Sequence, residues 1–303
     1  MEQTRREFLK LIAASALLAR THNLFAIKDT ASMPHRQLGK TGWKTSLLGF
    51  GGGSISHMDR KKASKVVTYA IEQGINYIDT ASTYGHHSSE AAIGAALTPK
   101  LRTRIFLTTK ILKRTRKTST QEFEESLRNL KTEPDLVQIH SVNSMSSLQS
   151  ALSKNGSIKT AQWAKKKGYA RFIGITGHTD PEVISKALDM YPFDTVLIPL
   201  GAADHHISSF EPVIEKANKK KIAVINMKLL AAGAEPRHLT LDELLHYGFS
   251  LPVSTAIVGF KSTSEIDQAV ESVKKFKPLK KEQVDAILKK SKKVADSGVM
   301  WWK

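Results

Sequence analysis

The sequence contains no cysteine among its 303 residues. A disulfide, a thiolate metal site and an iron–sulfur cluster are therefore all excluded. The rest of the composition is ordinary for a globular protein, since 41% of the residues are hydrophobic and 24% are charged. A chain of this length can form one large domain or two smaller ones.

The sequence also lacks an apolar run long enough to cross a membrane, which needs about 20 residues. The apolar run at residues 11–18 is too short, and it follows a twin-arginine pattern, Thr4-Arg5-Arg6-Glu7-Phe8-Leu9-Lys10. With a small-residue cleavage site near Ala26, this order resembles signals of the twin-arginine (Tat) pathway, which exports folded proteins. We predict a signal peptide over residues 1–26 and a periplasmic or exported protein without a stable membrane anchor. A disordered or amphipathic N-terminus is the alternative.

Acidic residues are scarce: 28 Asp and Glu stand against 46 Lys and Arg, a net charge of +18. Residues 1–26 hold four basic and two acidic side chains, so the remaining chain carries +16. Such a charge suggests a nucleic-acid partner. However, the lysines at 165–167, 219–221 and 289–290 lie near predicted helix ends, where cations complement the helix dipole. We expect no nucleic-acid binding, and a solvated rather than substrate-binding basic cluster at 113–117.

After residue 45 the chain alternates short apolar segments with helix-like segments. The apolar segments are nearly continuous in hydrophobicity, as expected for parallel strands covered on both faces. They are residues 47–50, 77–79, 105–109, 136–140, 172–176, 196–199, 223–227 and 256–259. The helical segments lie near residues 59–73, 88–97, 119–130, 157–167, 181–190, 210–220, 240–248 and 263–275.

Eight strand–helix units in series predict an α/β fold, a (β/α)8 TIM barrel, over residues 33–303. A doubly wound sheet is the alternative, but residues 49–54 lack the last glycine of its GxGxxG motif. Residues 36–45 predict an N-terminal β-hairpin that closes the barrel floor. Residues 280–296 predict a C-terminal extra helix. The apolar tail at 300–303 must pack within the protein or bind to something else.

Two helix starts carry capping signals. Ser119 is followed three residues later by Glu122, which has the spacing of a capping box. Asp180 precedes Pro181, which predicts an N-cap with proline at the first helical position.

Four ionisable residues occur at or just after predicted strand ends. Asp79 ends the second strand, Tyr84 lies in the loop that follows, Lys110 follows the third strand and His140 ends the fourth. In a barrel these strand ends meet at one mouth, where the chemistry takes place. Taken singly, each residue has a structural explanation as a helix cap or a solvated side chain. The convergence of four favours a functional site.

These residue types suit the donation of a proton. A tyrosine hydroxyl has a pKa of about 10, and a nearby ammonium such as Lys110 lowers it. The carboxylate of Asp79 keeps that ammonium charged, and His140 can hydrogen-bond the same substrate oxygen. A carbonyl that gains a hydride becomes an alkoxide and needs a proton. The arrangement therefore predicts a relay of Asp79, Lys110 and Tyr84 that tunes one proton donor.

From about residue 33 to residue 273 the sequence resembles the aldo-keto reductases. The resemblance is carried by residues 36–42 (RQLGKTG), 74–81 (GINYIDTA), 84–85, 105–110, 135–140 (DLVQIH) and 168–177. It implies NAD(P)H-dependent reduction of a small carbonyl substrate, with Tyr84 as general acid. It also implies that Asp79, Tyr84, Lys110 and His140 are the family's catalytic tetrad.

The resemblance further implies a cofactor site. Residues 259–263 match the family's adenosine-phosphate loop, in which Lys261 and Ser262 suit a 2′-phosphate, so NADP(H) is favoured over NAD(H). The implied cofactor-binding residues are Gly52, Thr176, Met227, Lys228, Gly259, Lys261, Ser262 and Glu265.

Three stretches depart from the family pattern for holding the nicotinamide. Residues 176–178 (Thr-Gly-His) stand where the family usually has Ser-Asn, and residues 198–200 (Ile-Pro-Leu) stand where it has Gln. Residues 227–228 (Met-Lys) occupy the place of a stacking aromatic. The stretch 174–178 and the glycines after the first strand resemble a bacterial branch of the family.

Two alternatives belong to other functional classes. A catalytically silent barrel could bind an anionic ligand or a glycan with its basic surface. A nucleic-acid binder would need its basic residues gathered on one face. The pairs His86-His87 and His205-His206 suggest a metal site, but neither has a third ligand that the sequence can place nearby, so we expect polar loops and no metal.

Overall fold

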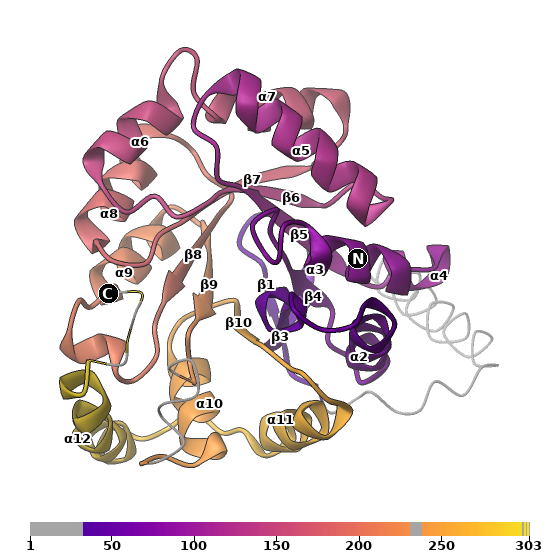
Figure 1. Ribbon diagram of the computed structural model, residues 1–303. Helices are drawn as coiled ribbons and strands as arrows, with labels where there is room; N and C mark the ends of the chain where they lie inside the picture. Colours follow the sequence, from indigo (N-terminus) through magenta and orange to yellow (C-terminus); the bar gives the residue numbers. More distant parts are fainter. Residues whose placement is uncertain (1–32, 231–237, 299, 301, 303) are drawn as a thin grey trace, which may run out of the picture. The chain divides into compact units, whose positions relative to one another are not determined.

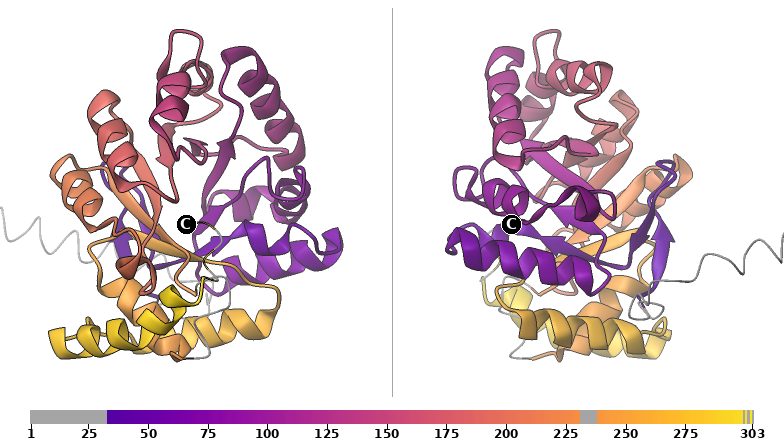
Figure 2. Two further views of the ribbon diagram at one scale, coloured as in Figure 1. Left: turned by 60° about the vertical axis from the view of Figure 1, so that its left-hand side comes forward. Right: turned by 90° about the vertical axis from the view of Figure 1, so that its right-hand side faces the viewer.

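The computed structural model describes residues 33–230, 238–298, 300 and 302, and one compact unit spans Met33–Lys303. Eight parallel strands close into a barrel in the order β10-β3-β4-β5-β6-β7-β8-β9, and helices surround it (Figures 1 and 2). The predicted (β/α)8 barrel is therefore confirmed. The predicted signal peptide at residues 1–26 lies outside the described residues.

The strands of the barrel fall where the apolar segments predict them. Their bounds are β3 Leu48–Gly51, β4 Tyr77–Asp79, β5 Phe106–Ile111, β6 Leu136–Ile139, β7 Phe172–Thr176, β8 Thr195–Pro199, β9 Ala223–Met227 and β10 Thr255–Val258. The helices are α2 Arg60–Glu72, α3 Ser88–Ala96, α4 Pro99–Arg102, α5 Arg116–Leu130, α6 Met145–Leu152, α7 Ile158–Lys167, α8 Pro181–Met190, α9 Glu211–Lys219, α10 Leu241–Ser250, α11 Thr263–Lys275 and α12 Lys281–Asp296, with 3₁₀ turns η1 Gly52–Ile55 and η2 Asp204–His206.

The N-terminal hairpin pairs β1 (His35–Gln37) with β2 (Lys44–Ser46) in antiparallel register. Arg36 fastens it to the chain that leads into β10, because its guanidinium donates to the carbonyl oxygens of Phe249, Leu251 and Val253 at 2.6–3.1 Å. Leu38 in the hairpin turn packs with barrel residues such as Tyr77 and is fully buried. The hairpin thus closes the floor of the barrel as predicted.

The side chains of each strand alternate between the barrel interior and the helix layer, as the pleat requires. In β4, Tyr77 belongs to the interior cluster and Ile78 to the cluster under the helices. In β5, Phe106 faces inward and stacks on Tyr77 at 5.7 Å, whereas Leu107 faces outward. The same alternation turns Asp79 of β4 and Lys110 of β5 toward the interior.

The capping predictions have different outcomes. Asp180 caps α8 as expected, since its carboxylate accepts from the amides of Glu182 and Val183. The capping box at Ser119 is wrong, because α5 begins three residues earlier with Thr115 as its N-cap. The Ser119 hydroxyl instead donates to the Thr115 carbonyl oxygen at 2.7 Å.

Two helices, α4 and α6, were not predicted, because each is at most eight residues long and lies in a connection between barrel units. The predicted extra helix is α12, which lies beside α10 (Figure 1). In the apolar tail, Met300 and Trp302 are buried with Ala203, Val294 and Ala295. None of the helices in the described ranges is both long enough and apolar enough to cross a membrane.

Candidate active site

Four polar side chains meet at the carboxyl ends of three adjacent strands. Asp79 ends β4, Lys110 is the fifth residue of β5, His140 follows β6, and Tyr84 lies in the loop between β4 and α3. Strand alternation turns Asp79 and Lys110 inward, because Tyr77 and Phe106 of the same strands already face the interior. All four predicted residues are therefore brought together.

Asp79 and Lys110 form a buried ion pair. The Lys110 Nζ lies 2.5 Å from Asp79 Oδ2, and both side chains are 1% exposed. Burial raises the pKa of Asp79 against the opposing effect of Lys110. Burial has the largest single effect on the pKa of Lys110 and lowers it, but the charges of Asp79 and Tyr84 and the hydrogen bonds to them together outweigh burial, so the pKa is raised. Lys110 consequently remains an ammonium at neutral pH.

The Lys110 ammonium also reaches Tyr84. Its Nζ lies 3.1 Å from the Tyr84 hydroxyl and 4.5 Å from the centre of the ring, and it donates to the Thr80 carbonyl oxygen at 2.8 Å. Lys110 lowers the pKa of Tyr84, as predicted, but burial has the larger and opposite effect, so the pKa is raised overall. Tyr84 therefore holds its proton at neutral pH.

His140 stands beside Tyr84, with its ring edge-on at 6.0 Å between centres. Its Nδ1 lies 3.5 Å from the Thr83 hydroxyl. Burial lowers the pKa of His140 well below its usual value, and the charges of Lys110, His178 and Arg114 lower it further. The imidazole is therefore neutral and can form hydrogen bonds without adding a further positive charge beside Lys110.

The loop that carries Tyr84 has an unusual backbone. Gly85, His86 and His87 all have positive φ, at 60°, 48° and 69°. Gly85 is required here, because a Cβ on it would lie 2.3 Å from the Ser56 carbonyl oxygen. His87 is held by Glu90 of α3, whose Oε2 lies 2.5 Å from His87 Nδ1. Glu90 is fully buried and also accepts from Thr109 of β5.

The basic cluster at residues 113–117 does not behave as one unit. Arg116 and Lys117 belong to the first turn of α5 and are exposed, as a solvated cluster should be. Arg114 differs, because it is partly buried behind His140. It donates to the carbonyl oxygens of Leu112, His140 and Ser141 at 2.5–3.0 Å. Arg114 thus shapes the loop behind the imidazole.

The family model of the aldo/keto reductases matches residues 47–243. The chain belongs to the aldo/keto reductase family. It is similar to L-galactose dehydrogenase of Arabidopsis thaliana, at 26% identity over 306 residues, which is 84% of this chain and 93% of that protein.

Solved structures of other proteins have the same fold as this chain. The holo form of an aldo-keto reductase from Bacillus halodurans superposes with a TM-score of 0.74 at 24% identity, over 85% of this chain and 96% of that one. An aldo/keto reductase from Klebsiella pneumoniae in complex with NADP and acetate has a TM-score of 0.68 at 17% identity, over 85% and 95%.

The candidate cofactor residues of this aldo/keto reductase lie at the same mouth as the tetrad, at the ends of β3, β7, β9 and β10. Gly52 is buried, and a Cβ on it would lie 2.7 Å from the Asp79 carbonyl oxygen. A Cβ on Gly259 would lie 2.8 Å from Ser54 Cβ. Both glycines therefore let two loops approach closely. Thr176 is buried, and its hydroxyl accepts from the Ser141 amide at 2.9 Å.

Met227 and Lys228 end β9 near the C-terminal tail. Met227 is buried among the interior residues. The Lys228 Nζ lies 4.9 Å from the ring centre of Trp302, whose indole donates to Asp204 Oδ1 at 3.1 Å. Burial lowers the pKa of Lys228, Asp204 opposes this effect, and the charge of Lys110 adds to it. Lys228 thus lies within electrostatic reach of the tetrad.

The remaining candidates form the N-terminus of α11. Ser262 is its N-cap and accepts from the Glu265 amide at 3.3 Å. Glu265 reaches back to the Lys261 amide at 2.6 Å. Ser262 and Glu265 therefore have a helix-capping role in this structure. The Lys261 side chain is exposed and available to an anion.

Sequence reasoning missed Gln138, Arg114 and Glu90. Gln138 belongs to β6 and lies two residues before His140, which directly follows that strand, so strand alternation was the signal for its inward direction. Glu90 follows Tyr84 by six residues and has no spacing signal of its own. The side chains of the pair His205-His206 contact other groups: His205 Nδ1 lies 2.9 Å from Glu211, and His206 Nε2 lies 2.8 Å from the Leu288 carbonyl oxygen.

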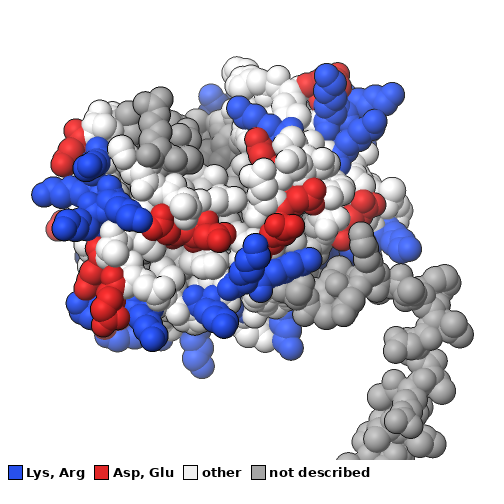
Figure 3. Space-filling view, turned by 90° about the horizontal axis from the view of Figure 1, so that it is seen from below, with Lys and Arg blue, Asp and Glu red and all other residues white. Residues whose placement is uncertain are grey.

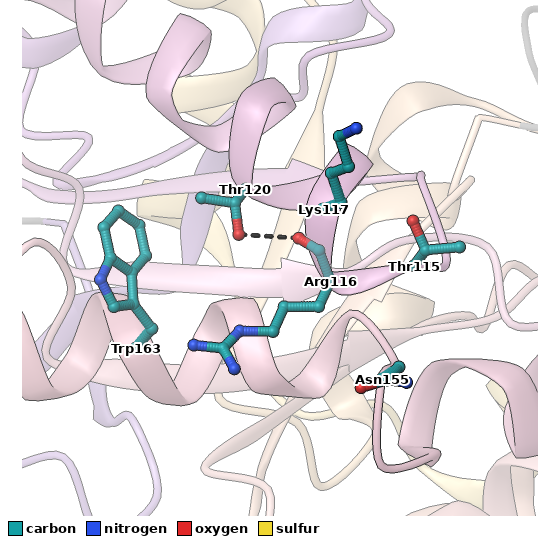
Figure 4. Close-up of a pocket in the computed structure, with 6 residues that line it drawn as sticks. All are labelled: Thr115, Arg116, Lys117, Thr120, Asn155 and Trp163. Carbon is teal, nitrogen blue, oxygen red and sulfur yellow. Dashed lines mark hydrogen bonds between the residues drawn. The ribbon is translucent and has the colours of Figure 1, made fainter.

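The molecular surface gives two further facts. On the face seen in Figure 3, basic side chains stand in separate groups with acidic side chains between them. A hollow of about 570 Å³ on the outer flank of α5 and α7 holds none of the tetrad (Figure 4). Its lining residues are Thr115, Arg116, Lys117, Thr120, Asn155 and Trp163.

Proposed function

We propose that the protein reduces the carbonyl group of a small aldehyde, ketone or sugar with NADPH, and that Tyr84 is the general acid. The observation that carries this proposal is the position of the Lys110 ammonium. It contacts the Asp79 carboxylate at 2.5 Å and the Tyr84 hydroxyl at 3.1 Å, at the end of the barrel where such enzymes act.

The four residues divide the work of proton donation. Tyr84 keeps its proton at neutral pH because burial raises its pKa, so it is ready to donate. Neutral His140 orients the substrate oxygen by a hydrogen bond. When Tyr84 gives up its proton, the Lys110 ammonium stabilises the phenolate that remains. Asp79 keeps Lys110 charged. NADPH, when bound, supplies the hydride.

A glycine and several lysines at the mouth suit such a cofactor. Gly53 faces the Tyr84 ring, and a Cβ on it would lie 3.7 Å from two ring atoms. The backbone next to the reactive hydroxyl therefore carries no side chain. Lys261 and Ser262 would hold the adenosine phosphate, and Lys228 adds a positive charge deeper in the mouth. The Klebsiella relative, which has the same fold, was solved with NADP.

The test is to measure NADPH oxidation by the purified protein with a panel of small aldehydes, ketones and sugars. We expect turnover of at least one substrate and stabilisation of the protein by NADP(H). NADP(H) binding without turnover across the panel would contradict the proposed reaction.

A second candidate is a catalytically silent barrel that binds an anionic glycan. The flank hollow favours it, because the Trp163 ring lies beside the Arg116 guanidinium in a hollow that Lys117 also lines (Figure 4). Binding of sulfated or carboxylated oligosaccharides that Trp163→Ala abolishes, with no NADPH turnover, would support this candidate over the reductase.

We also propose that the protein is exported in folded form through the twin-arginine pathway. The support is the order of charged, apolar and small residues in the first 26 positions. A barrel without cysteine has no thiol to be oxidised outside the cytoplasm.

A further inference from the structure

Gln138 lies at the centre of the barrel interior, directly behind the candidate active site. It is the third residue of β6 and is fully buried. In the barrel register it stands between Lys110 of β5 and Gly174 of β7. Its Nε2 donates to Asp79 Oδ1 at 3.2 Å and to the Thr108 hydroxyl at 2.8 Å.

The Asp79 carboxylate is therefore held from two sides. One oxygen accepts from Lys110, and the other accepts from Gln138. A buried carboxylate without a donor on its second oxygen is costly, and each donor favours the charged form. We propose that Gln138 is a positioning residue for the proposed reductase, which holds Asp79 ionised and turned toward Lys110. The inference rests on the proposed function for its catalytic consequence.

The interior is built to accommodate this amide. Gly174 provides the space, because a Cβ on it would lie 3.1 Å from Gln138 Cγ and 2.3 Å from the Thr195 hydroxyl oxygen. Gln138 Oε1 finds no hydrogen-bond partner in the described part of the chain. The reversed amide would place that oxygen against the Asp79 carboxylate, so Asp79 dictates the orientation.

A merely structural role makes a different prediction from a positioning role. If Gln138 only filled the interior, an apolar side chain of similar length would serve equally well, because a buried polar atom without a partner stabilises nothing. If Gln138 positions Asp79, the same replacement removes a donor from a buried charge. Thr195 supplies a matched control, since its hydroxyl oxygen lies in the same interior layer and also lacks a partner among the described residues.

The experiment compares Gln138→Leu, Gln138→Glu and Thr195→Val in the full chain. For Gln138→Leu we expect a fall in single-turnover NADPH oxidation of roughly tenfold or more, the effect of one charge-assisted hydrogen bond. The Kd for NADPH should stay within about twofold, because Gln138 lies beneath the tetrad and not at the candidate cofactor loops. Thr195→Val should match the parent protein in both measurements.

Gln138→Glu adds a test by pH. At about pH 5.5 the introduced carboxyl group can stay protonated and donate a hydrogen bond to Asp79. At about pH 8 it is ionised, and its negative charge repels Asp79. The ratio of Gln138→Glu turnover to parent turnover should therefore be at least about fivefold higher at pH 5.5 than at pH 8, because the protonated carboxyl group partly restores a charge-assisted hydrogen bond. An equal ratio at both pH values would overturn the proposal, even if Gln138→Leu fails to fold.

One readout is independent of activity. The carboxyl carbon of Asp79, assigned as the NMR signal missing from Asp79→Asn, should titrate at higher pH in Gln138→Leu than in the parent. An unchanged titration together with unchanged turnover would overturn the proposal. A shifted titration in a protein that reduces no carbonyl would refute the proposed function and leave the positioning of Asp79 intact.

Discussion

The Tyr84 hydroxyl is subject to two opposing influences on its pKa: burial raises it and the Lys110 ammonium lowers it. Burial prevails in the structure, which suits a residue that must hold a proton and then release it. Lys110 acts mainly after release, when the phenolate needs a counter-charge. The two residues should therefore act as one unit.

Tyr84→Phe removes only the hydroxyl and keeps the ring beside Gly53. The Kd for NADPH should change little, because the shape of the mouth is retained. Single-turnover NADPH oxidation should fall at least ~100-fold, the lower end of the contribution of general acid catalysis. Full activity on any substrate that the parent reduces would remove Tyr84 from the mechanism.

Lys110→Met should lower turnover in the same direction, because the phenolate loses its counter-charge. The loss of turnover in the double variant Tyr84→Phe/Lys110→Met should be clearly smaller than the product of the losses in the two single variants.

Lys110→Met also leaves the Asp79 carboxylate without its cationic partner in the interior, which costs about 3–5 kcal/mol of stability. Asp79→Asn/Lys110→Met is the control that removes both charges, and thermal unfolding should show it to be the more stable of the two variants.

At the candidate phosphate loop, Lys261 has an exposed side chain and an amide fixed by Glu265. NADPH should bind more tightly than NADH, and Lys261→Glu should reduce or reverse the difference by roughly tenfold or more, since a charge-assisted contact is worth about 1.5–3 kcal/mol. Lys274→Glu, in the last turn of the same helix, changes the net charge equally and should leave the ratio of Kd values unchanged. Equal affinities in the parent would contradict the phosphate assignment.

At the scale of elements, the start of α3 sets the position of Tyr84. His87 is its N-cap residue in a left-handed conformation, and it bonds to buried Glu90 and lies 3.5 Å from Glu125 of α5. The hydrogen bond to Glu90 raises the pKa of His87, burial opposes it, and the charges of Glu90, Glu125 and Glu122 add to the increase. The contribution of His87 to stability is therefore fully present below its unfolded pKa of about 6.5 and is lost as the pH rises through the folded value.

In His87→Asn the new residue tolerates the left-handed region as histidine does, but asparagine cannot become charged. The loss in free energy of unfolding, measured by urea titration, should be larger at about pH 6 than at about pH 8.5. His86→Asn is the matched control, because His86 is exposed, also has positive φ and forms no ion pair in the described ranges. A pH-independent loss at His87 would show that backbone conformation, and not the charge pair, accounts for it.

The boundaries of some strands and helices followed from the local sequence more closely than those of others. The eight strands and α12 were placed within one or two residues, because continuous apolar runs and amphipathic spacing are local properties. The start of α5 was misplaced, since Glu122 has another partner. Its carboxylate accepts from the amides of Leu112 and Lys113 and from the Ser82 hydroxyl. Glu122 therefore forms tertiary hydrogen bonds instead of capping the helix at Ser119.

At the scale of the whole molecule, export is the remaining prediction. Arg5 and Arg6 should be required together, so Arg5→Lys/Arg6→Lys should leave the protein in the cytoplasm as a folded barrel. Fractionation of cells followed by immunoblotting measures this. Lys61→Arg/Lys62→Arg, at the start of α2, alters a basic pair within the barrel and should not affect the location. Unchanged export of the first variant would contradict the twin-arginine prediction.

The sequence alone determined the barrel and the four tetrad positions, because both depend on order along the chain: apolar segments recur eight times, and polar residues follow three of them. Only the tertiary structure decided how those residues are tuned. The raised pKa of Tyr84, the neutral His140 and the Gln138 hydrogen bond to Asp79 all depend on burial and on contacts such as those of Tyr84 with Lys110 and of Gln138 with Asp79, which lie 26 and 59 residues apart in the chain. Desolvation acts through space, so no local pattern of residues encodes it.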